Sequence, residues 1–177
     1  MMRLMQYMGL ALLFIAGIAA GFLLSNGRRQ TWEMLSGPAD MGPVHFEELV
    51  RSPTGNDALA CPPGWCAKAQ SDFDPPVYAL NLVALSQRFR ESLDAEEKLE
   101  LIGDSQGLHF RYVQYTPWME WPDTISVVFM PLGADQSTLA IYSRSRFGDG
   151  DLGTNLKRIK RWLQRLEKWE IQRGRQA

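Results

Sequence analysis

The segment from Leu139 to Trp162 constrains the fold most, because its apolar period changes once, from two residues to about 3.6. The first half alternates like a strand and places Tyr142, Arg144 and Arg146 on one face. A glycine-rich turn follows at residues 148–153. Beyond it, apolar residues recur at spacings of three and four, at Leu152, Leu156, Ile159, Leu163 and Leu166. We therefore predict a strand that turns directly into a basic amphipathic helix.

The rest of the folded region predicts three further strands and one earlier helix. The apolar spacing from Val77 to Leu93 favours a helix. The four predicted strands cover residues 98–102, 108–115, 125–130 and 138–147. Short loops containing glycine join the strands as hairpins, and one sheet face receives the apolar stripes of both helices. We expect a two-layer α+β domain in the order α-β-β-β-β-α, with an antiparallel four-stranded sheet.

An uncharged run from Leu4 to Leu24 precedes this domain. The run is long enough to span the hydrocarbon of a membrane as a helix. A cleaved signal peptide is the alternative, since Arg3 precedes the run and residues 18–20 form an acceptable processing site. Because apolar residues continue to Leu24, we expect an uncleaved transmembrane helix.

We accordingly expect three regions along the chain. Residues 1–27 form a membrane anchor and residues 28–76 form an irregular tether, because the latter are rich in glycine, proline and polar residues without a sustained period. Residues 77–173 form the α+β domain.

Cys61 and Cys66 are the chain's two cysteines and flank a Pro-Pro-Gly turn. A pair this close in a turn can reach disulfide geometry, and two free thiols are the alternative. We expect no metal site, since zinc needs further ligands and His45 and His109 are isolated in the sequence. A disulfide is typical of an oxidising compartment. We therefore expect an inner-membrane, single-pass protein whose C-terminal domain faces the periplasm or the outside.

The stretch SRSRFGDGDLGTNLKRI, residues 143–159, resembles the closing signature of the family called domain of unknown function 1499. The residues that match this signature are Arg144, Arg146, Gly148, Asp151, Leu152, Gly153, Asn155 and Arg158. The cysteine pair in CPPGWC and the tripeptide Trp121-Pro122-Asp123 are two weaker upstream matches. The resemblance covers about residues 61–166. It implies a fold and a location in the cell envelope, but no reaction.

The two arginines of the predicted strand are the best candidates for specific chemistry. Guanidinium groups about 7 Å apart on one strand face repel each other unless a negative charge lies between them. One interpretation gives them internal carboxylates; the other gives them an external anion, such as a lipid headgroup or a carboxylate, helped by free amides at the helix start. We expect the internal interpretation. The candidate arginine corner comprises Arg144, Arg146, Asp123, Asp149, Asp151, Asn155 and Arg158.

Enzyme motifs such as Gly-x-Ser-x-Gly, His-Glu-x-x-His and the phosphate-binding loop are absent from the sequence. We expect no cofactor, and no nucleic-acid partner for an envelope protein of net charge −1. The membrane is the expected partner through residues 4–24, and anionic lipid or a membrane protein through the basic C-terminal helix. The predicted function is a membrane-anchored, extracytoplasmic, non-catalytic docking or accessory module. The alternative is an enzyme or binding protein that acts on an anionic ligand at Arg144 and Arg146.

Overall fold

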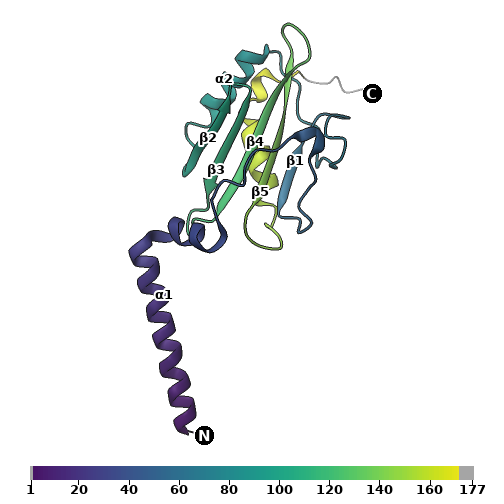
Figure 1. The fold of residues 1–177 in the computed structure, drawn as a ribbon. Coiled ribbons are helices and arrows are strands. Elements are labelled where there is room, and N and C mark those ends of the chain that lie inside the picture. The colour runs from purple at the N-terminus through teal and green to yellow at the C-terminus, as the bar shows by residue number, and fades with distance from the viewer. Residues whose placement is uncertain (1, 172–177) are drawn as a thin grey trace.

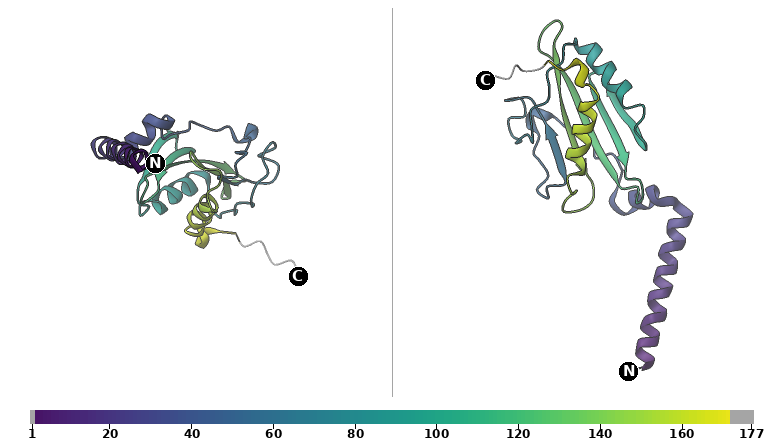
Figure 2. Two further views of the ribbon diagram at one scale, coloured as in Figure 1. Left: turned by 90° about the horizontal axis from the view of Figure 1, so that it is seen from below. Right: turned by 180° about the vertical axis from the view of Figure 1, so that it is seen from behind.

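Two helices cover one face of an antiparallel sheet, and the segment that follows the N-terminal helix runs along the other face (Figure 1 and Figure 2). The computed structural model describes residues 2–171, although not the side chains of residues 2–5, 19, 22–24 and 26. The strand order is β1-β5-β4-β3-β2. The strands are β1 (Asp57–Ala60), β2 (Leu99–Ser105), β3 (His109–Tyr115), β4 (Pro122–Pro131) and β5 (Ser137–Ser145). The helices are α1 (Met2–Ser36), α2 (Leu82–Ser92) and α3 (Thr154–Gln164), with short 3-10 turns η1 (Phe46–Glu48) and η2 (Glu167–Trp169).

Aromatic side chains join the two helices to the sheet. Phe89 of α2 contacts Phe129 of β4 and Trp162 of α3 edge to face, with ring centroids 5.4 Å and 6.0 Å away. Phe89 and Trp162 are completely buried. Asn81 begins α2, because its side chain accepts a hydrogen bond from the Ala84 amide. The apolar stripes predicted from the helical spacing therefore form the core between the helices and the sheet.

The prediction of a four-stranded sheet is wrong, because the sheet has five strands. All four predicted strands form, but β1 adds an edge from the segment that we expected to be an irregular tether. β1 pairs antiparallel with β5, with Asp57 opposite Arg144 and Ala60 opposite Ile141. Its four residues are buried on both faces, so they show no alternation of apolar and polar residues. A strand this short leaves no period to detect in the sequence.

The predicted transmembrane helix over residues 4–24 is also not supported. A helix does form there, as part of α1. Within the part of the chain that the structure describes, however, no helix has both the length and the apolar character needed to cross a membrane. The side chains of residues 4, 5, 19 and 22–24 lie outside the described set.

Gly27 divides α1 into two parts. Its φ of 73° and ψ of 162° are not helical, and a residue with a side chain rarely adopts this conformation. The part before Gly27 runs away from the domain, whereas residues 28–36 lie against one end of the sheet (Figure 1). Trp32 Nε1 donates a hydrogen bond to the Met119 carbonyl at 2.6 Å, and Arg28 Nη1 donates to the Trp118 carbonyl at 2.6 Å. These contacts fix where the chain enters the domain.

We predict that β1 is an integral part of the folded unit. Leu59 is completely buried in β1, so Leu59→Ala should lower the free energy of unfolding by about 2–5 kcal/mol. Val50 is exposed in the loop before β1, so Val50→Ala is the control. It should change the free energy of unfolding by no more than about 0.5 kcal/mol. Urea unfolding of the two variants measures the difference. Equal stabilities would show that β1 does not contribute to the cooperative unit.

Candidate functional site

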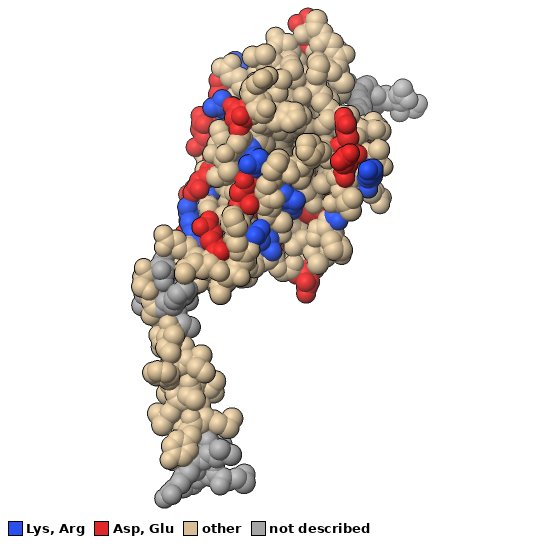
Figure 3. All heavy atoms as spheres, viewed as in Figure 1, with Lys and Arg blue, Asp and Glu red and all other residues tan. Residues whose placement is uncertain are grey.

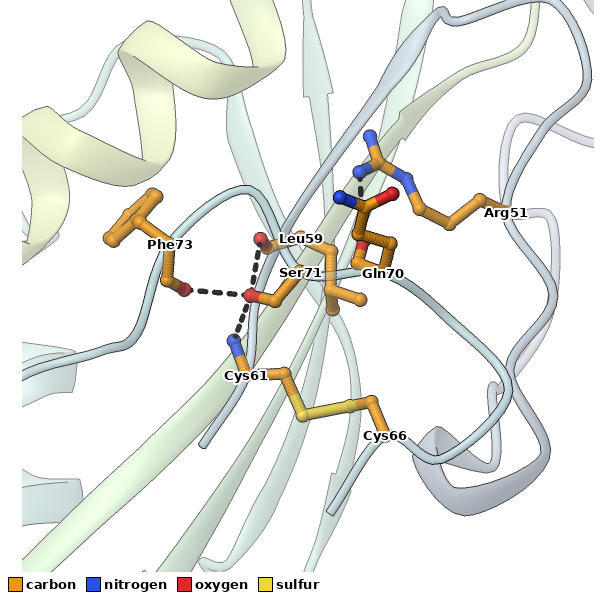
Figure 4. The surroundings of a disulfide bond; sticks show 7 residues. All are labelled: Arg51, Leu59, Cys61, Cys66, Gln70, Ser71 and Phe73. Atoms are coloured by element: carbon orange, nitrogen blue, oxygen red, sulfur yellow. Dashed lines mark hydrogen bonds between the residues drawn. A yellow bond between two sulfur atoms is a disulfide. The ribbon is translucent and has the colours of Figure 1, made fainter. Parts of the chain in front are cut away.

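The predicted disulfide between Cys61 and Cys66 is confirmed. Both cysteines are buried. The Cys61 amide donates to the Ser71 hydroxyl at 3.0 Å, and this hydroxyl donates to the Phe73 carbonyl at 2.7 Å (Figure 4). The disulfide therefore closes a loop that is hydrogen-bonded to the end of β1. Its role is structural.

The strand β5 divides the arginine corner between the two faces of the sheet. Ser143 and Ser145 face α3, where they make hydrogen bonds with Asn155. Arg144 and Arg146 lie on the opposite face, because side chains alternate along a strand, and they contact the chain that leaves α1. The predicted corner is therefore two separate groups of residues, and a single anion could not touch both.

Arg144 and Arg146 bind backbone carbonyl groups, and among the described residues neither forms an ion pair. Arg144 Nη2 donates to the carbonyls of Met41 and Gly42, both at 2.9 Å. Arg146 Nε donates to the Ser36 carbonyl at 3.0 Å. The two guanidinium groups thus hold residues 36–42 against the sheet. We call them the carbonyl clamp.

The clamp requires a glycine where the chain leaves α1. Gly37 has a φ of +85°, and a Cβ atom there would lie 2.8 Å from Arg146 Nη2. Burial lowers the pKa of Arg144, an effect that the nearby Asp40 carboxylate opposes. Asp40 itself accepts a hydrogen bond from Arg111 Nε at 2.9 Å. The carboxylate that acts on Arg144 is therefore hydrogen-bonded to a third arginine.

Arg158 and Asp123 form a buried ion pair on the α3 face. Arg158 Nη1 also donates to Asn155 Oδ1 at 2.7 Å and to Ser143 Oγ at 2.8 Å, and its Nε donates to Gln114 Oε1 at 2.6 Å. A buried ion pair is tolerated only when such additional hydrogen bonds satisfy the charged groups. This cluster therefore cross-links α3 to β3, β4 and β5.

Asn155 extends the same cluster to the edge of the sheet. Its Nδ2 donates to the Asn56 carbonyl at 3.0 Å and to Ser145 Oγ at 2.9 Å. The side chain is completely buried. Asp151 supports it from the preceding turn, where its carboxylate accepts the amides of Gly153 and Asn155. Asp149, by contrast, is exposed in the turn and is not part of the cluster.

Chemically, these polar groups satisfy one another. The Arg158 guanidinium is occupied by four side-chain partners, and the Ser143 hydroxyl donates to Asn155 Oδ1 rather than to a base. The described residues contain no group of three or more His, Cys, Asp or Glu side chains that could hold a metal ion. The arrangement therefore stabilises the fold, and it offers neither an activated nucleophile nor a set of metal ligands.

Asn56 and Gln114 are members of the cluster that sequence reasoning missed. One signal pointed to a buried polar partner: Ser143 and Ser145 share a strand face with the apolar residues Leu139 and Ile141. Buried hydroxyl groups are almost always hydrogen-bonded. The residue types of the distant partners were not readable from this pattern.

We predict strong energetic coupling between Arg158 and Asp123. Arg158→Met and Asp123→Leu should each lower the free energy of unfolding by about 3–5 kcal/mol, because each leaves one buried charge unpaired. The double variant should lose much less than the sum of the two single variants. Urea unfolding at neutral pH measures this cycle.

The exposed pair Arg88 and Glu91, with N and O atoms 2.8 Å apart, is the control. Its coupling should be much weaker than that of the buried pair, because solvent screens exposed charges. Single Arg158 and Asp123 variants as stable as the unmodified protein would contradict the structural role of the buried pair.

Comparison with known proteins finds the same family that the motif at the β5–α3 turn resembles. A family model described as Protein of unknown function (DUF1499) matches residues 53–166. This range includes the disulfide, all five strands and the whole buried cluster. No curated protein matches the chain. The match to the family model shows that the chain belongs to the DUF1499 family.

Proposed function

We propose that the protein is a membrane-associated docking module without catalytic activity, held at lipid by the first part of α1. One observation carries this proposal. Eight large apolar side chains between residues 7 and 18 are 58–72% exposed: Tyr7, Met8, Leu10, Leu12, Leu13, Phe14, Ile15 and Ile18. Since successive helical residues turn by about 100°, these side chains surround the helix. A helix that is apolar on all sides is normally buried in a protein core or in lipid.

The domain does not supply that burial. The first part of α1 extends away from the sheet and both other helices (Figure 1). Charged side chains of both signs are scattered over the domain, whereas the described part of this helix shows none on the same face (Figure 3). Lipid hydrocarbon is therefore the environment that this part of the chain matches best.

The disulfide supports an extracytoplasmic location for the domain. Disulfides persist in oxidising compartments and are rare in the cytosol, and the Cys61–Cys66 bond is buried within the folded unit. A location at the outer face of the inner membrane agrees with both features of the chain.

Docking is better supported than chemistry on an anionic ligand. An anion at Arg144 and Arg146 would have to compete with the carbonyl groups that already accept hydrogen bonds from Arg144 Nη2 and Arg146 Nε. Arg144 Nε is buried and has no hydrogen-bond partner among the described residues, so solvent does not give an anion open access to it. At the end of α3, Arg161 and Arg165 form ion pairs with the buried side chain of Glu96. Burial alone would raise the pKa of the Glu96 carboxyl group, but hydrogen bonds from Arg161 and Gln114 lower it to about 2. Within residues 154–171 of the described chain, the exposed basic residues that form no ion pair are Lys157, Lys160 and Lys168, and these are the ones we propose for contact with anionic lipid or a membrane protein.

We predict that the full-length protein floats with phosphatidylcholine vesicles in a density gradient. Replacing Leu10, Phe14 and Ile18 together by Asp should leave most of the protein in the bottom fraction, because charged side chains insert poorly into hydrocarbon. The control replaces Val83 and Leu132, which are exposed on the domain, by Asp, and it should float normally. Unmodified protein that stays in the bottom fraction would refute the lipid association.

A further inference from the structure

We infer that the end of the domain next to Gly27 is a second lipid contact and rests on the membrane surface. This inference rests on the proposed function, because it takes α1 as the segment that brings the domain to lipid. We call this end the basal surface. It consists of residues 28–36 of α1, the β3–β4 loop at residues 116–121 and the β5–α3 loop at residues 146–153.

An aromatic cluster makes these three segments one rigid surface. Trp32 from α1 contacts Trp121 and Phe147 with ring centroids 6.2 Å and 5.4 Å away, and the latter two rings lie 6.3 Å apart. The hydrogen bonds from Arg28 and Trp32 to the β3–β4 loop add to this contact. The basal surface is thus assembled by side chains from three distant parts of the sequence.

Apolar side chains gather on this surface and point into solvent. Eleven large apolar side chains beyond Gly27 are exposed among the described residues, and six of them belong to the three basal segments. These six are Met34, Leu35, Trp118, Met119, Trp121 and Leu152. Single exposed apolar residues need no explanation, but a group drawn from three segments is typical of an interaction surface.

Leu152 is the clearest member of the group. Its side chain is 95% exposed, so it gains nothing from the core. Its φ of 52° is in the left-handed region, which a leucine adopts only at an energetic cost. Both features disfavour a leucine here in the isolated domain. Contact with an apolar environment outside the chain accounts for its presence.

Lipid is the partner that the surroundings of the basal surface favour. The apolar part of α1 leaves the domain at this end (Figure 2), so any membrane that holds residues 7–18 lies next to the basal surface. Tryptophan prefers the boundary between hydrocarbon and headgroups, and Trp118 is 80% exposed. Arg28 and Arg29 directly follow Gly27, and their side chains bind the Trp118 carbonyl and the Glu100 carboxylate, which fixes the start of the basal surface next to the apolar helix. The chemistry of the surface therefore matches the membrane interface.

Quenching of an attached dye by lipids that carry a quencher tests this inference in the full-length protein. Leu152→Cys and Trp118→Cys each introduce one thiol for an environment-sensitive dye, because Cys61 and Cys66 are bonded to each other. Leu132→Cys is the control: Leu132 is exposed in the turn between β4 and β5, at the opposite end of the sheet. All three positions are exposed, so labelling should leave the fold intact. Circular dichroism of each labelled variant checks this.

In phosphatidylcholine vesicles, the dyes at positions 152 and 118 should shift to the blue. Lipids that carry a quencher near the headgroup boundary should reduce their emission about twofold or more, since interfacial side chains lie about 5–10 Å deep. The dye at position 132 should keep its emission.

The outcomes separate this inference from the proposed function. If the labelled protein floats with vesicles but all three dyes behave alike, the basal contact is wrong and the lipid association stands. Protein that does not float overturns both. A blue shift that grows with protein concentration in the absence of vesicles would assign the basal surface to a second copy of the chain and overturn the lipid contact.

Discussion

The buried ion pair between Arg158 and Asp123 is the interaction on which the rest of the structure depends. Taking both charges out of water is costly unless every hydrogen bond around them is made. The helix and strands that carry the hydrogen-bond partners must therefore keep fixed positions relative to one another. Arg158 orients Asn155 and Gln114, and Asn155 in turn holds the start of β1. The position of α3 on the sheet, and with it the course of the preceding loop, follows from one arginine.

On the opposite face of β5, arginine side chains again donate hydrogen bonds, but to backbone carbonyl groups. Arg144 and Arg146 hold the carbonyl groups of residues 36–42, so the chain enters the domain along a defined path. α1 therefore leaves the molecule beside the loops that carry Trp118 and Leu152. The structural role of the arginines and the proposed lipid contacts are linked in this way, because the clamp determines where the apolar helix lies.

The features that could be predicted from the sequence are those that show a regular period or whose residues lie close together along the chain. The β5–α3 unit was predictable because its period changes within a few residues, and the disulfide was predictable because Cys61 and Cys66 flank one turn. β1 was not, since four buried residues have no alternation. The partners of Arg144 and Arg146 were also hidden, because a backbone carbonyl has no signature in the sequence. The nearby aspartates were the obvious partners for these arginines, yet the strand places Asp123 on the other face, with Arg158.

Thermal unfolding of Arg144→Ala and Arg146→Ala tests most directly the central functional claim, that the arginines of the carbonyl clamp serve the fold and not an external anion. Each variant loses charge-assisted hydrogen bonds worth about 1.5–3 kcal/mol, so both melting temperatures should fall by several degrees. The fall should be similar in low and high salt, because the partners are neutral carbonyl groups rather than carboxylates. Unchanged or raised melting temperatures in both variants would contradict the account and would return these arginines to the role of a binding site for an anion.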